Sequence, residues 1–204
     1  MPGRKETAGK PARYADVFLP PNPQLPTPNP MHFRTRAIHV GNEPDPATGA
    51  VVPPIHLAST FVQPGAGQWG EFDYSRSGNP TRKALETTLA SLESGSGALA
   101  FATGMAAIHC ATMLLRPGDH LLAGTDIYGG TYRLLHKIVA PMGITVSLAP
   151  AADLAALERA FQPETRLVWI ESPGNPLLSI TDIAACADLA RKHGAWLGVD
   201  NTFA

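Results

Sequence analysis

Residues 167–200 read LVWIESPGNPLLSITDIAACADLARKHGAWLGVD. The apolar runs at 167–170 and 195–199 each predict a buried strand. The segment between them carries apolar residues at helical spacing and then a helix end, in the order Ile183, Cys186, Ala190 and His193-Gly194. A strand, a helix and a strand in this order indicate a right-handed crossover between two parallel strands.

The same alternation continues toward the N-terminus. Further apolar runs predict buried strands at 98–103, 120–123 and 144–148. Helices are predicted from Gly104 to Arg116, around Tyr132, Leu135 and Val139, and around Leu154, Leu157 and Phe161. Strands that alternate with helices form a parallel sheet with helices on both faces, so the sequence predicts the α/β class.

Upstream of residue 98 the sequence lacks this regularity. Eight of the 20 prolines fall within residues 1–30, which predicts a solvated tail, with a ligand for a proline-binding groove as the alternative. Residues 31–78 are rich in Pro and Gly and show no period, which favours an arm over a core. Asn79-Pro80 then caps a helix of about a dozen residues. We therefore expect a tail (1–30), an arm (31–78) and an α/β domain (79–204).

Composition excludes several classes of protein. The 204 residues include 16 Lys and Arg against 17 Asp and Glu, and this formal charge of −1 gives no basis for binding nucleic acid. Apolar runs such as 106–115 are much shorter than the roughly 20 residues of a membrane span, and no secretory signal is evident. Cys110 and Cys186 lie far apart in helical patterns, which is typical of buried thiols in a reducing compartment. We expect a cytoplasmic protein without membrane contacts.

The histidines give no indication of a metal site. His56, His109, His120 and His193 have no metal-ligand spacing to the cysteines. No metal is predicted.

Candidate ligand-binding residues follow the predicted strands, where ligands of parallel sheets bind. Gly104 and Met105 begin a helix after the strand at 98–103, so their amides could hold a phosphate, or could simply start a helix. Asp200 ends an apolar strand, where a carboxylate needs a cation or hydrogen bonds. A protonated pyridine nitrogen would be such a cation, and a turn aspartate is the alternative.

Two tyrosines are further candidates. Tyr128 precedes Gly129-Gly130, and because glycine permits close approach, its ring could lie on a planar cofactor; a packed loop residue is the alternative. Tyr74 and Arg76 carry a phenol and a guanidinium that could both bind phosphate, or they could lie on an exposed turn.

A dinucleotide-binding oxidoreductase would share this alternating architecture. Gly95-Ser96-Gly97 precedes the predicted strand at 98–103, whereas a pyrophosphate-binding turn follows its strand. No acidic residue ends the next strand in the position for a ribose. The motifs therefore disfavour this class.

Longer segments carry a resemblance to a known family. They are VPPIHLASTF (52–61), YSRSGNPTR (74–82), TGMAAI (103–108), YGGTYR (128–133), ESPGNPL (171–177) and VDNTF (199–203). Together and in this order, they resemble the Cys/Met-metabolism family of pyridoxal-phosphate-dependent enzymes, and its gamma-synthases above all. The resemblance runs from about Thr35 to the last residue. It implies the large domain of a fold-type I pyridoxal 5'-phosphate (PLP) transferase, in truncated form.

The resemblance also implies roles for single residues. Gly104 and Met105 would hold the cofactor phosphate through their backbone amides. Asn175 would bond the phenolic oxygen, and Asp200 would pair with the ring nitrogen. Tyr128 would stack on the pyridine ring and lie near the proton transfers, which makes it the catalytic candidate.

Other implied contacts involve the second ring face and a second subunit. Thr202 would pack against the opposite face of the ring. Tyr74 and Arg76 would reach the phosphate in the neighbouring subunit, so the arm would contact that subunit. A homotetramer built from dimers is therefore expected.

The implied reaction is a gamma-replacement in sulfur amino-acid metabolism. The thiol of cysteine replaces the leaving group of an activated homoserine ester and gives cystathionine, a step of methionine biosynthesis. Small amino acids would be the substrates. Gamma-lyase and O-acylhomoserine sulfhydrylase activities share this cofactor chemistry and remain open. A noncatalytic subunit that docks on a full-length partner is a further alternative.

One residue that the resemblance requires lies beyond this sequence. The family's Schiff-base lysine follows the Asp-Asn-Thr-Phe segment, and the chain ends at Ala204 before reaching it. The lysines present lie in the tail or on predicted helices, and they are Lys5, Lys10, Lys83, Lys137 and Lys192. We therefore expect a polypeptide that is poorly folded and inactive by itself.

Overall fold

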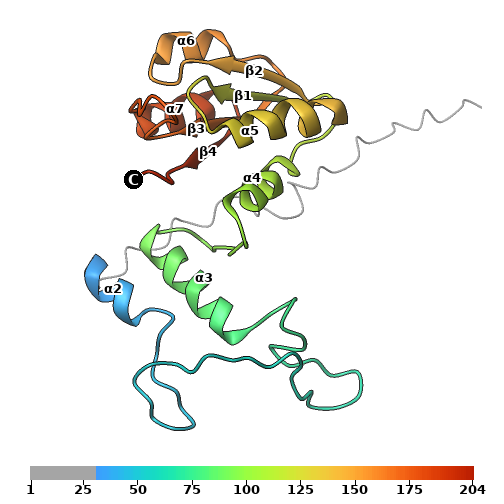
Figure 1. Ribbon diagram of the computed structural model, residues 1–204, viewed down its shortest axis with the longest axis vertical. Coiled ribbons are helices and arrows are strands. Elements are labelled where there is room, and N and C mark those ends of the chain that lie inside the picture. Colours follow the sequence, from blue (N-terminus) through green and yellow to red (C-terminus); the bar gives the residue numbers. More distant parts are fainter. Residues whose placement is uncertain (1–30) are drawn as a thin grey trace, which may run out of the picture. The chain divides into compact units, whose positions relative to one another are not determined.

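The computed structural model describes residues 31–204 (Figure 1). The chain divides into two compact units, with the boundary in sequence after Phe101. The first unit is described over residues 31–101 and the second over residues 102–204. The tail predicted over residues 1–30 lies outside the described residues.

The first unit contains two helices, α2 (Phe33–His39) and α3 (Pro80–Leu92), which pack on each other. The predicted start of α3 is confirmed, because the Asn79 side chain accepts a hydrogen bond from Thr81 N at 2.8 Å and Pro80 opens the helix. Helix α2 was not predicted, since its seven residues carry no apolar period. Within the described residues of this unit none is buried, so α3 leaves Leu85 and Leu89 half exposed.

The strand predicted at 98–103 is wrong. These residues form no strand, and Leu99 and Phe101 are 74% and 42% exposed. An extended segment becomes a strand only when a neighbour supplies ladder hydrogen bonds. Within residues 31–204 no strand pairs with this segment. The apolar run therefore stays extended, although α4 (Gly104–Thr112) begins after it as predicted.

The second unit contains a parallel sheet, as predicted. Its strands are β1 (His120–Gly124), β2 (Thr145–Ala149), β3 (Thr165–Glu171) and β4 (Trp196–Asp200). They lie in the order β2-β1-β3-β4, and each neighbouring pair is parallel. The carboxyl ends of β1, β3 and β4 therefore lie side by side at one edge of the sheet.

Helices connect these strands. They are α5 (Gly129–Leu134), which continues through a π turn, η1 (Leu135–Val139), and a 3-10 turn, η2 (Ala140–Met142), then α6 (Leu154–Arg159) and α7 (Ile183–Lys192). The side chains of Thr103, Asp153 and Asp182 cap α4, α6 and α7 by accepting a hydrogen bond from the amide three residues later. These caps explain why the helices begin where they do.

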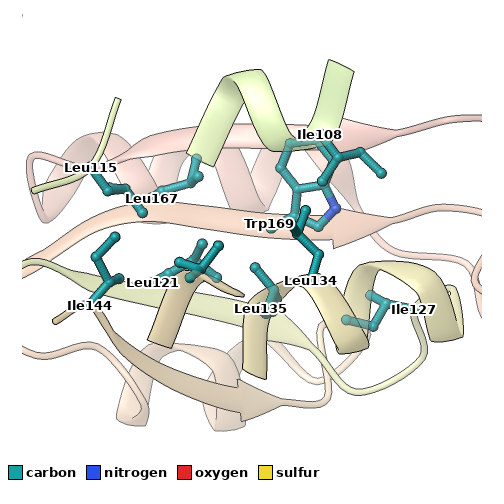
Figure 2. Packing of buried hydrophobic residues seen from close by; sticks show 11 residues of the cluster. Ile108, Leu115, Leu121, Ile127, Leu134, Leu135, Ile144, Leu167 and Trp169 are labelled. Atoms are coloured by element: carbon teal, nitrogen blue, oxygen red, sulfur yellow. The ribbon is translucent and has the colours of Figure 1, made fainter. Parts of the chain in front are cut away.

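The core consists of two apolar clusters on opposite faces of the sheet, because successive strand residues point to opposite faces. Leu121 and Trp169 belong to one cluster, which is completed by α4, α5 and η1; Figure 2 shows its side chains. Leu122 and Ile170 belong to the other, which is completed by α6 and α7. Helices thus cover both faces, and burying each leucine contributes about 1.5–3 kcal/mol.

The expectation that both cysteines are buried holds for one of them. Cys186 is fully buried in α7, whereas Cys110 is exposed on α4. The residues of α4 that face the core are Ile108 and Thr112. Cys110 lies two positions from each of them, which places it on the opposite side of the helix.

Within the described part of the chain, the helices all lack the combination of length and hydropathy that crossing a bilayer requires.

Candidate cofactor site

A cavity of about 310 Å³ lies at the carboxyl ends of β3 and β4 in the second unit. It is lined by Thr103, Gly104, Met105, Ile108, Tyr128, Glu171, Asn175, Asp200, Thr202 and Phe203. Every candidate residue predicted in this unit is therefore in the wall of one cavity. Such convergence is expected when functional residues follow neighbouring parallel strands.

One end of the cavity is the N-terminus of α4. The Thr103 hydroxyl accepts a hydrogen bond from Ala106 N at 3.1 Å and so caps the helix. Gly104 and Met105 supply the first two helical amides, which have no carbonyl earlier in the helix to receive them. A Cβ built on Gly104 would meet no atom within 4 Å, so the space beside this residue is open. Open amides at a helix N-terminus suit a phosphate.

Another part of the wall carries two carboxylates. Glu171 and Asp200 end β3 and β4 and are direct partners in the parallel register. Asp200 Oδ1 accepts hydrogen bonds from Thr202 N at 3.0 Å and from Thr202 Oγ1 at 2.6 Å. Among residues 31–204, no Lys, Arg or His forms an ion pair with either carboxylate. This region therefore favours a cationic group of a ligand.

The environment of Glu171 disfavours its charge. Burial raises the pKa of Glu171, the hydrogen bond from Tyr128 N opposes this rise, and the nearby charges of Asp200 and Asp126 add to it. The residue is only 5% exposed. A cation near Asp200 would relieve this repulsion between carboxylates.

Tyr128 stands at the start of α5, beside both carboxylates. Its amide donates to Glu171 Oε2 at 2.7 Å, and its side chain is 45% exposed. A Cβ on Gly130 would lie 2.2 Å from Cε1 of the Tyr128 ring, so only glycine leaves room for this ring position. Gly130 thus leaves room for the Tyr128 ring itself, and the predicted stacking of this ring on a cofactor stays a prediction.

Asn175 lies half-buried in the loop between β3 and α7. Asp126 holds this loop by accepting hydrogen bonds from Leu177 N at 3.1 Å, Ser179 N at 3.3 Å and the Ser179 hydroxyl. The Asn175 side chain is therefore presented to the cavity by a loop with a fixed backbone.

Tyr74 and Arg76 belong to the first unit, where they form a pair. Arg76 Nη2 donates to the Tyr74 hydroxyl at 2.7 Å, and the guanidinium carbon lies 5.0 Å from the centre of the Tyr74 ring. The phenol and guanidinium are thus adjacent, as joint binding of one anion requires. Their predicted role at a neighbouring subunit's cofactor stays a prediction.

The sequence analysis gave no role to Glu171 or Asp126, and it did not name Phe203 as a wall residue. The signal for Glu171 was present, because it ends an apolar strand as Asp200 does. The signal for Asp126 was absent, since its partners lie more than 50 residues away in sequence.

The geometry fits a ligand with an anionic group and a cationic ring. Open amides lie at α4, a half-exposed aromatic ring at Tyr128, and at Glu171 and Asp200 two carboxylates that no cation of residues 31–204 pairs with. Within the described range, no group of three or more His, Cys, Asp or Glu side chains could hold a metal ion.

Comparisons with known proteins identify relatives of this chain. The profile of the family described as Cys/Met metabolism PLP-dependent enzyme matches residues 34–204. A probable cystathionine gamma-synthase from Herpetosiphon aurantiacus is 48% identical over 172 residues, which cover 84% of this chain and 54% of the relative. Cystathionine gamma-lyase from Bos taurus is 49% identical over 175 residues, covering 85% and 43%.

A solved structure agrees with these relatives. The crystal structure of cystathionine gamma-lyase from Lactobacillus plantarum complexed with L-serine superposes with a TM-score of 0.81 at 48% identity, covering 85% of this chain and 45% of that one. The chain thus spans about half the length of the relatives it matches.

Proposed function

Because the chain belongs to the Cys/Met metabolism PLP-dependent enzyme family, we propose that its cavity binds PLP with the phosphate at α4 and the ring nitrogen at Asp200. PLP is the cofactor of this family, and when bound it supplies an electron sink for carbanions of an amino-acid substrate. The observation that carries the proposal is that one cavity has open amides at α4 and, at Asp200, a carboxylate that pairs with no Lys, Arg or His among residues 31–204.

Different residues of the cavity wall bind different parts of the cofactor. The Gly104 and Met105 amides donate to the phosphate, and Asn175 donates to the phenolic oxygen. Asp200 keeps a proton on the ring nitrogen, since its carboxylate stabilises the cationic form. Tyr128 would lie against one face of the ring, where its phenol could transfer protons near the substrate. Thr202 would lie against the opposite face.

For the whole protein, we propose gamma-replacement on an activated homoserine ester by the thiol of cysteine, giving cystathionine. The similarity to a probable cystathionine gamma-synthase over 84% of this chain supports this reaction. The similarity to a bovine gamma-lyase is equally high, so cleavage of cystathionine is the second candidate. The substrates in either case are small amino acids.

We also propose a homo-oligomer in which the arm reaches a neighbouring subunit. Support comes from the exposed apolar side chains of the arm, such as Ile55, Leu57 and Trp69, at 76%, 93% and 77%. Apolar surface of this extent is typical of interfaces. The Tyr74–Arg76 pair would then bind the phosphate across the interface. The unpaired cysteines agree with a reducing, cytoplasmic location.

The test uses the full-length protein that contains this sequence. Purified with PLP, it is assayed for cystathionine formation from an O-acylhomoserine and cysteine, and separately for cysteine release from cystathionine. We expect cofactor absorbance in the visible range and faster formation than cleavage. Faster cleavage would assign the gamma-lyase reaction instead.

Asp200→Asn tests the proposed site itself. The amide cannot stabilise a protonated ring nitrogen by charge, so both reactions should slow by several orders of magnitude while the fold is kept. Failure of the unmutated protein to bind PLP would refute the proposed function.

A further inference from the structure

Two carboxylates near the cavity, Asp126 and Glu171, are assigned no contact with PLP in the function proposed above. Both line a second, smaller cavity of about 200 Å³, whose wall is formed by residues at and after the ends of β1, β2 and β3. Glu171 also lines the larger cavity. The loops that follow β1 and β3 each carry one candidate cofactor ligand, Tyr128 in the first and Asn175 in the second.

Asp126 belongs to the loop after β1 but holds the loop after β3. It accepts hydrogen bonds from the Leu177 amide, the Ser179 amide and the Ser179 hydroxyl. Burial raises the pKa of Asp126, but these three hydrogen bonds outweigh burial, and the net pKa is lowered. The charged form is therefore the one that holds the loop.

The backbone of that loop approaches Asp126 very closely. A Cβ built on Gly174 would lie 2.3 Å from Asp126 Oδ2 and 2.8 Å from Ser179 Oγ. Only glycine fits at position 174 this close to the Asp126 carboxylate. Gly174, which directly precedes Asn175, therefore leaves room for the Asp126 carboxylate.

Glu171 makes the opposite connection. It ends β3, and its Oε2 accepts a hydrogen bond from the Tyr128 amide at 2.7 Å. Tyr128 is the N-cap residue of α5, and its own side chain makes no capping hydrogen bond. Glu171 therefore fixes the backbone from which the Tyr128 ring projects.

We propose that Asp126 and Glu171 are a reciprocal pair of positioning residues: each anchors the loop opposite its own, and together they set the positions of Tyr128 and Asn175 for the cofactor. This proposal rests on the proposed function only for the identity of the ligand. The reciprocal hydrogen bonds exist without it.

The first experiment measures PLP affinity in the full-length protein by spectroscopic titration. Asp126→Ala and Glu171→Ala should each weaken affinity roughly ten-fold or more, because a lost hydrogen bond to a carboxylate releases the loop. Glu171→Gln keeps an acceptor oxygen for Tyr128 N and should remain within a few-fold of wild type. Asp188→Asn, on the exposed face of α7, is the matched control and should have no effect.

A second experiment separates positioning from general stability. In an Asn175→Ala background, Asp126→Ala should cause little further loss of PLP affinity, and in a Tyr128→Ala background the same should hold for Glu171→Ala. A residue that supports only the fold would give additive losses in both backgrounds. Additive losses, or a Glu171→Gln variant as weak as Glu171→Ala, would overturn the proposal.

A third readout needs no cofactor. In the PLP-free full-length protein, Asp126→Ala should speed hydrogen exchange at the Leu177 and Ser179 amides, and Asp188→Asn should not. Unchanged hydrogen exchange at these amides in Asp126→Ala would refute the proposed positioning role of Asp126 and Glu171. If exchange responds as expected but wild type binds no PLP, the loop pair stands and the proposed function fails.

Discussion

The two units of the chain use similar residues in different ways. In the second unit, Leu121, Leu122 and Val168 are 0% exposed, because a four-stranded parallel sheet brings them between two layers of helices. In the first unit, Leu57 and Val62 are 93% and 98% exposed, although they are equally apolar. The difference shows that apolar residues make a core only where strands and helices repeat closely enough to stack.

The largest expected effect is on the core of the second unit. Leu122→Ala should lower the free energy of unfolding by about 2–5 kcal/mol, since a fully buried leucine leaves a cavity. Chemical denaturation of the full-length protein measures this value.

The matched change in the first unit is Leu57→Ala. At protein concentrations low enough to keep subunits apart, it should change the free energy of unfolding by less than about 0.5 kcal/mol. Similar losses for the two variants would break the contrast between the units.

The next effect concerns Gly130, against which the Tyr128 ring packs. Gly130→Ala should cost about 1–3 kcal/mol of unfolding free energy, because the added methyl group meets the Tyr128 ring. Gly97→Ala in the first unit should cost far less, since a Cβ there meets no atom within 4 Å. Thermal unfolding of both variants tests this, and Tyr128→Ala should relieve the cost of Gly130→Ala.

Burial in the second unit also predicts an effect of pH. His120 is fully buried, its Nδ1 lies 2.7 Å from Thr165 Oγ1, and burial lowers its pKa although Glu164 acts in the opposite direction. The unfolded chain therefore takes up a proton at higher pH than the folded one, so stability is complete above about pH 6.5 and falls as the pH drops below it.

Urea denaturation between pH 7 and pH 5 measures this slope. His120→Gln should make the slope shallower, whatever its effect on stability at neutral pH. A slope that is the same in the variant would show that other groups cause the pH dependence.

The smallest expected effect is on the exposed ion pairs. Lys83 pairs with Glu71 in the first unit, and Lys192 pairs with Glu158 at 2.6 Å in the second. Lys83→Ala and Lys192→Ala should both leave the melting temperature nearly unchanged, because water and salt screen exposed pairs. A clear drop for only one of them would show that the units differ in surface charge as well as in burial.

Sequence patterns predicted the second unit well and the first unit poorly. The strands at 120–123, 144–148, 167–170 and 195–199 and the start of α3 at Asn79-Pro80 were predicted from local patterns. Helix α2 was missed because its N-cap is His32 and it has no apolar period. The extended segment at 98–103 was mistaken for a strand because pairing depends on a neighbour that a local pattern does not reveal.

The sequence by itself determined the order of β1 to β4 and of the helices between them, the cap of α3 and the motifs that mark the cofactor family, because each depends on residues a few positions apart. Only the tertiary structure decided which apolar residues are buried and how the loops that carry Tyr128 and Asn175 hold each other. The physical reason is distance along the chain: Glu171 and Asp126 contact partners 43 to 53 residues away, and folding alone brings them together.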